Sequence, residues 1–251
     1  MPDLPYDPIA AIARDGASLL AVAEEAGLQA PVPACPGWNV GDLVDHVSEV
    51  WSFWSGIVKR RLTTVDEVRD FEDGRVTPSS ADRFATAAGN LAELVSVLGP
   101  GDAADERACV WTWTGANQPI SWVRRRMAQE TAMHLTDALE ASGRSGPIDA
   151  PLAADGVDEF LTYFGTCERA LVEPVGGSTL LQATDQGLAW IVRQHDDRLV
   201  HEAVHGPTSA DAIVSASSAT LLQWLWRRAA EVTIAGDPGV AARLHRFSSL
   251  D

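Results

Sequence analysis

The sequence contains only three cysteines, Cys35, Cys109 and Cys167, and no closely spaced Cys-x-x-Cys pair. Small secreted domains rely on dense, paired cysteines, so an odd and widely spaced set argues against a disulfide framework and is typical of a reducing compartment. The N-terminus also lacks a basic stretch followed by an apolar run, which predicts that there is no secretory signal. These absences together predict a cytoplasmic protein.

Positive charge is scarce, because 19 Lys and Arg residues stand against 35 Asp and Glu residues, for a formal net charge of −16. Such a surface repels phosphate backbones and anionic lipid headgroups. Apolar runs long enough to span a bilayer are also missing. We therefore expect neither nucleic acid nor a membrane among the partners.

The first two-thirds of the chain show the apolar periodicity of helices. Asn39 is placed to cap the second helix, and the Gly-Pro-Gly run at residues 99–101 ends the third. The expected helices cover residues 8–26, 40–62, 80–98, 120–141 and 152–171. The charged segment 63–78 is predicted to be a loop.

The periodicity changes from 3.6 to 2 after a Pro- and Gly-rich linker at residues 174–178. Short strands are expected at residues 179–185, 188–194, 198–204 and 212–217, followed by a helix at 218–234. The sequence thus predicts an α+β chain, with a helical bundle over residues 1–175 and a small α+β domain over residues 176–251.

The helix predicted at residues 120–141 carries two polar residues on the stripe that should face the core. Glu130 and His134 are four residues apart, so their side chains leave the same face one turn apart. Burying an unpaired carboxylate costs several kcal/mol, so Glu130 requires a partner. A divalent cation bound by both side chains is one such partner. The simpler alternative is a solvated Glu–His pair.

His46 occupies a similar position on the second helix, between Leu43 and Val50 on an apolar face. Two facing helices would then supply His46, Glu130 and His134 around one point. Imidazole and carboxylate ligands suit Zn, Fe, Ni or Mn, and three protein ligands leave positions open, as catalytic sites do. The alternative is an ordinary core histidine.

Two motifs resemble those of a known family. The run Pro33-Ala-Cys-Pro-Gly-Trp38 and the His46 that follows it resemble the start of the metal-bearing helix in the mycothiol-dependent maleylpyruvate isomerase family, whose members contain a DinB-like four-helix bundle. The run Glu130-Thr-Ala-Met-His134 resembles the Glu-x-x-x-His helix of that family. Residues 188–193 and 221–228 resemble the small, sterol-carrier-like α+β domain that the family adds at its C-terminus.

This resemblance implies that His46, Glu130 and His134 bind zinc or another divalent metal, and that mycothiol is the thiol cosubstrate. The metal would activate the thiolate to attack a small electrophilic substrate. Addition followed by elimination would give cis–trans isomerisation, as with maleylpyruvate, and addition alone would give S-conjugation. The sequence is compatible with a monomer or a homodimer.

Two other functions remain open. One is a non-catalytic module that binds a metal or a small ligand. The other is a metallopeptidase, because residues 201–205 match the His-Glu-x-x-His motif, with Glu231 as the nearby helical candidate for a third ligand. That motif works on a helix, whereas these residues follow a strand pattern and Gly206-Pro207 would end a helix at once. The sequence context therefore disfavours a peptidase.

Three further features carry predictions. Arg227 and Arg228 are candidates for binding a substrate carboxylate, with surface arginines as the alternative. The basic run at residues 124–126 is predicted to be a solvated helix face. Cys35 is interpreted as a structural turn residue.

Overall fold

The computed structural model describes residues 4–73, 82–99, 101, 107–165 and 173–247. The chain divides into two compact units, Met1–Gly146 and Pro147–Asp251. Within the described ranges, no helix combines the length and the apolar character needed to cross a membrane.

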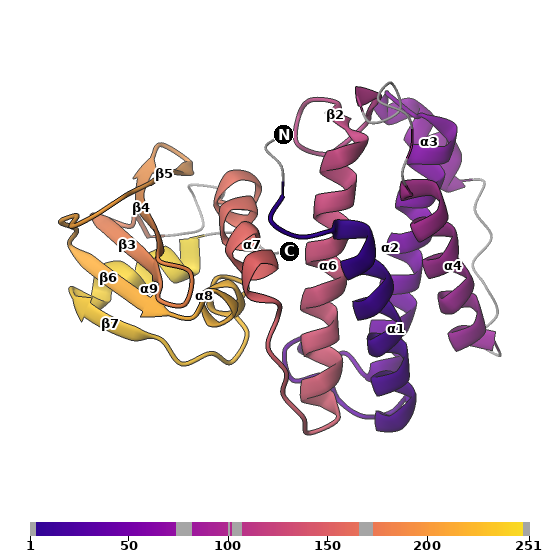
Figure 1. Cartoon of the computed structure of the whole chain (residues 1–251), viewed down its shortest axis with the longest axis horizontal. Helices are drawn as coiled ribbons and strands as arrows, with labels where there is room; N and C mark the ends of the chain where they lie inside the picture. Colours follow the sequence, from indigo (N-terminus) through magenta and orange to yellow (C-terminus); the bar gives the residue numbers. More distant parts are fainter. Residues whose placement is uncertain (1–3, 74–81, 100, 102–106, 166–172, 248–251) are drawn as a thin grey trace. The chain divides into compact units, whose positions relative to one another are not determined.

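The first unit is a bundle of long helices that lie side by side (Figure 1). Helix α1 packs against α6, and α2 packs against α4. These helices are α1 (Pro8–Ala26), α2 (Val40–Arg60), α4 (Arg83–Leu98) and α6 (Ile120–Ala141). Two short antiparallel strands, β1 (Cys109–Val110) and β2 (Gln118–Pro119), precede α6. The four-helix bundle expected from the periodicity is therefore present.

Helix α2 begins at a capping box. The Asn39 side chain accepts a hydrogen bond from the Asp42 amide, and the Asp42 carboxylate accepts one from the Asn39 amide. Such reciprocal bonds satisfy two backbone donors that the first turn leaves without helical partners. The helix ends at Arg61, which adopts a left-handed conformation. Because both ends are fixed, the rotation of α2 and the direction of His46 are fixed with them.

The segment predicted as a loop at residues 63–78 contains a helix, α3 (Val65–Asp73), and this prediction is wrong over those residues. The Glu67 carboxylate accepts hydrogen bonds from the Thr63 and Thr64 amides, and the Thr64 hydroxyl accepts one from the Glu67 amide. This T-x-x-E capping box was the available signal. Only Val68 of α3 is buried, so no apolar stripe marks the helix. Residues 74–78 lie outside the described ranges.

The second unit contains a five-stranded sheet with the order β5-β4-β3-β6-β7. Strand β3 is parallel to β6, and the other neighbours are antiparallel. The strands are β3 (Ser178–Ala183), β4 (Leu188–His195), β5 (Arg198–Ala203), β6 (Ala212–Ala216) and β7 (Thr233–Gly236). The four strands expected from alternation are confirmed. Helices α8 (Ser218–Leu225) and α9 (Pro238–Phe247) pack on the sheet.

The helix expected at residues 152–171 is α7 (Ala150–Tyr163), which ends at Tyr163, and residues 166–171 lie outside the described ranges. It packs against α8 and β5 and so belongs to the second compact unit. The units therefore divide after Gly146, and the boundary expected at residue 176 falls inside the second unit.

The helix expected at residues 218–234 is shorter than predicted. Helix α8 ends at Leu225, because Arg227 adopts a left-handed conformation and the Arg228 amide bonds back to the Gln223 carbonyl. The chain then forms β7, in which Ile234 pairs with Val214 of β6. Residues 233–236 form a strand because they pair with the edge of β6. The apolar residues of the segment do not by themselves predict that pairing.

Candidate metal centre

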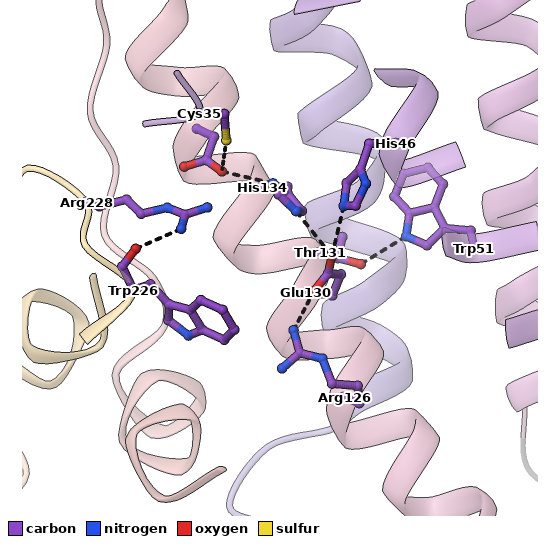
Figure 2. Close-up of polar contacts among 10 residues, drawn as sticks. Cys35, His46, Trp51, Arg126, Glu130, Thr131, His134, Trp226 and Arg228 are labelled. Atoms are coloured by element: carbon purple, nitrogen blue, oxygen red, sulfur yellow. Dashed lines mark hydrogen bonds and ion pairs between the residues drawn. The ribbon is translucent and has the colours of Figure 1, made fainter. Parts of the chain in front are cut away.

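The structure brings together the three side chains that the sequence singled out. The Nε2 atom of His46 lies 3.3 Å from Oε1 of Glu130, and the Nε2 atom of His134 lies 3.2 Å from the same oxygen. The potential ligand atoms of the three residues all lie within 4.8 Å of one another. Figure 2 shows His46 reaching this point from α2, while Glu130 and His134 reach it from α6.

These spacings fit a bound divalent ion. Two ligand atoms held at about 2.1 Å from an ion in a tetrahedral arrangement lie about 3.4 Å apart. The two imidazole nitrogens are 3.3 and 3.2 Å from the carboxylate oxygen, close to that value. The His46 side chain is 34% exposed, so the site is open on one side. Imidazole and carboxylate donors are those that zinc and related ions accept.

Arg126 determines which oxygen of Glu130 faces the two histidines. Its guanidinium donates to Oε2 of Glu130 one turn away, which leaves Oε1 toward His46 and His134. The Arg126 side chain is only 3% exposed. Arg125 is buried as well, so the prediction that residues 124–126 form a solvated face is wrong for Arg125 and Arg126. For Arg126, the four-residue spacing to Glu130 was the missed signal.

Asp137 orients the second histidine. Its Oδ2 atom accepts a hydrogen bond of 2.9 Å from Nδ1 of His134, and Asp137 is fully buried. Because this bond occupies Nδ1, Nε2 of His134 is directed toward Glu130. A carboxylate on the far nitrogen of a ligating histidine is the usual arrangement in metal sites. Cys35 also contacts Asp137, with its thiol donating to Oδ2 at 3.7 Å.

Aromatic side chains hold the first histidine and join the two helices. The Trp38 ring lies 5.0 Å from the His46 ring, and the His46 ring lies 4.9 Å from that of His134, measured between centroids. The Trp51 indole nitrogen on α2 donates to the Thr131 hydroxyl on α6 at 3.2 Å. This buried bond fixes α2 against α6 near the site.

The charges around Glu130 are strongly coupled. Burial raises the pKa of Glu130, but the Arg126 charge and hydrogen bonds from His134 and His46 outweigh burial and hold this pKa well below its usual range. Burial lowers the pKa of His134, but its bonds to Asp137 and Glu130 prevail and raise this pKa to about 9. At neutral pH and without an ion, the cations Arg126 and His134 therefore balance the anions Glu130 and Asp137.

The model of the mycothiol maleylpyruvate isomerase N-terminal domain matches residues 9–139, which is more than half of the chain. The chain belongs to this family. The matched segment contains all three residues of the cluster.

Two solved structures share the fold over most of the chain. A crystal structure of the mycothiol-dependent maleylpyruvate isomerase is similar with a TM-score of 0.63 at 12% identity, over 91% of each chain. A histidine-to-alanine mutant of that enzyme is similar with a TM-score of 0.59 at 11% identity, over 86% of each chain. These similarities confirm the α+β fold class. No curated protein sequence matches the chain significantly.

The His-Glu-x-x-His motif does not form a peptidase site in this family member. His201 and Glu202 lie in strand β5, as expected from the alternation, and Gly206 follows with a positive φ. The Nε2 atom of His201 lies 3.2 Å from the Asp158 carboxylate. Across the described ranges, both groups of residues with metal-ligand spacing include His134 and neither includes His201.

Arg227 and Arg228 lie just after α8 in the second unit. Arg227 donates to the backbone carbonyls of His245 and Arg246, and Arg228 donates to the Trp226 carbonyl. The Arg227 bonds join the end of α8 to the end of α9, and the Arg228 bond closes the turn after α8. A role of the two arginines in binding a substrate carboxylate stays a prediction.

Metal binding should release protons at neutral pH. The pKa of about 9 for His134 means that its imidazole is protonated at pH 7 in the ion-free protein, and an ion must displace that proton from Nε2. Apparent affinity should therefore fall about tenfold for each pH unit below about 9. Calorimetric titration with Zn²⁺ in buffers of different ionisation enthalpy measures the released proton. A binding enthalpy independent of the buffer would contradict this prediction.

Proposed function

We propose that this chain is a metal-dependent enzyme that activates mycothiol for attack on a small electrophilic substrate. The observation that supports this proposal most directly is the convergence of two imidazole nitrogens on one carboxylate oxygen. The three residues lie in a segment that matches the mycothiol maleylpyruvate isomerase N-terminal domain. The similarity of the whole fold to a mycothiol-dependent maleylpyruvate isomerase supports it further.

The residues that would hold the ion are His46, Glu130 and His134. A bound divalent ion supplies Lewis acidity and lowers the pKa of a thiol that binds to it. The chain's own groups prepare this site in advance. Asp137 keeps Nε2 of His134 directed at the site, Arg126 keeps Oε1 of Glu130 available, and Trp38 packs on the His46 ring.

The proposed reaction begins with addition of the thiolate sulfur to an electrophilic carbon of a cis-ene substrate. Addition converts the double bond to a single bond, which rotates. Elimination of the thiolate then returns the double bond in the trans form, so the thiol is regenerated. The second candidate outcome is S-conjugation, in which addition is followed by protonation and the thiol stays attached. The family supports isomerisation as the first candidate.

The decisive experiment measures metal content and turnover of the same purified protein. We expect about one divalent ion per chain, and conversion of maleylpyruvate that requires both mycothiol and the ion. Mass spectrometry of the products distinguishes isomerisation, which leaves mycothiol unchanged, from conjugation, which adds its mass to the substrate. Chelator-treated protein, reloaded with Zn²⁺, is the matched control. Stoichiometric metal without any thiol-dependent product would favour a non-catalytic binding module.

A further inference from the structure

A second group of potential metal ligands lies on the other edge of the His134 ring. Oδ2 of Asp137 lies 2.9 Å from Nδ1 of His134 and 3.7 Å from Sγ of Cys35. The potential ligand atoms of these three residues all lie within 4.8 Å of one another. The contacts that run from Cys35 to His134 can be followed in Figure 2.

We propose that Cys35, His134 and Asp137 form a second cation site, which takes a thiophilic divalent ion such as Zn²⁺ or Cd²⁺. The donors would be Sγ of Cys35, Nδ1 of His134 and Oδ2 of Asp137. This site goes beyond the proposed enzymatic function, because it uses a different nitrogen of His134 and neither His46 nor Glu130.

The spacing of the donors suits such an ion. With zinc–sulfur distances of about 2.3 Å and zinc–oxygen distances of about 2.0–2.2 Å, tetrahedral sulfur and oxygen ligands lie about 3.5 Å apart. The observed separation of Cys35 Sγ from Asp137 Oδ2 is 3.7 Å. The nitrogen of His134 and the oxygen of Asp137, at 2.9 Å, would need to separate by about half an ångström.

The chemistry of the donors separates the two sites. The first cluster contains only nitrogen and oxygen donors, whereas the second contains a thiolate, which favours thiophilic ions. Asp137 is fully buried, and its carboxylate together with the Cys35 thiolate would neutralise a dication. Binding would release the thiol proton of Cys35 and the Nδ1 proton of His134 to solvent. The sulfur–ion and nitrogen–ion bonds replace those two bonds to hydrogen.

The loop that carries Cys35 is already fixed in place. The Val32 amide donates to the Trp38 carbonyl, the Cys35 amide to the Val32 carbonyl, and the Trp38 amide to the Cys35 carbonyl. Gly37 supplies the positive φ that this turn requires. The thiol is therefore held beside a carboxylate that is 102 residues away in sequence, and little backbone order has to be gained when an ion binds.

The shared histidine determines how the two sites influence each other. With an ion on Nδ1 alone, Nε2 of His134 keeps its proton and its bond to Glu130. The second site therefore fills without the first. Occupying both sites at once requires the ring to lose both protons, so the second ion to bind should bind more weakly than the first.

Cadmium titration of the ion-free protein tests this proposal, because a cadmium–thiolate bond has its own ultraviolet charge-transfer absorption. We expect this band in the wild type, in Cys109→Ser and in His46→Ala, and its loss in Cys35→Ser. Cys109 is the matched control because it is an exposed thiol that belongs to neither group of potential ligands. Asp137→Asn keeps the thiol but should weaken cadmium binding at least about tenfold.

The result that would overturn the proposal is a band of wild-type strength in Cys35→Ser, or no band in the wild type. Circular dichroism checks that each variant is folded. If Cys35→Ser does not fold, Cys35→Ala replaces it in the titration. Turnover of the same wild-type protein is measured separately. A wild type that binds cadmium through Cys35 but lacks thiol-dependent turnover would refute the proposed enzyme and leave the second site intact.

Discussion

In a Cys35→Ser background, which removes the second proposed cation site, His46→Ala should lose tight binding of a divalent ion and reduce thiol-dependent turnover by more than about 100-fold. The substitution removes one of three ligands and leaves Glu130 with His134 and Arg126 as partners. The His46 side chain is 34% exposed, so its removal leaves no buried charge without a partner and the fold should persist. Elemental analysis and the isomerase assay on the same preparation measure both effects.

His201→Ala provides the matched control for that experiment. His201 is also a partly buried histidine paired with a carboxylate, Asp158, but it lies in β5 of the second unit. This variant should keep its ion and its turnover. If the two variants retained equal metal content, the assignment of His46 as a ligand would be wrong.

Arg126→Met should destabilise the first unit by about 3 kcal/mol, because it removes one of the two buried cations, Arg126 and His134, that contact the Glu130 carboxylate. Methionine preserves much of the apolar length of arginine, so the loss reports mainly on charge. Bound Zn²⁺ should recover part of the stability, since the ion would supply positive charge to Glu130. Urea unfolding of the ion-free and zinc-loaded proteins measures both effects.

Arg69→Met tests whether loss of any arginine has the same effect. Arg69 is 70% exposed and pairs with Asp66 on the surface of α3. Its removal should change the free energy of unfolding by less than about 0.5 kcal/mol. An equal loss of unfolding free energy in the two variants would show that the Arg126–Glu130 pair contributes no more to stability than a surface ion pair.

The positions of His46, Glu130 and His134 were predictable because a helix has a fixed period. Polar residues on an otherwise apolar stripe must face the interior, and two such helices in one bundle face each other. The burial of Arg126 was not predicted, because three consecutive arginines on an acidic chain are typical of a solvated surface. What decides its burial is that nearly all faces of α6 are covered, which depends on how its neighbours pack.

The remaining differences arise where tertiary pairing determines local structure. Segment 218–234 contains enough apolar residues for one helix, but the positive φ at Arg227 ends α8 and allows Ile234 to join the sheet. Helix α7 was expected in the bundle, because helix count alone does not show that it packs against α8 and β5. In both places, contacts between residues distant in sequence outweigh local periodicity.

His46 and Glu130 are separated by 84 residues in sequence, although they lie side by side in the bundle. A denatured chain cannot present these groups together, so it has no chelating geometry to offer. Any free energy that an ion gains on binding the native first unit therefore also opposes its unfolding. The supply of the ion would then determine the stability of the folded protein as well as its activity.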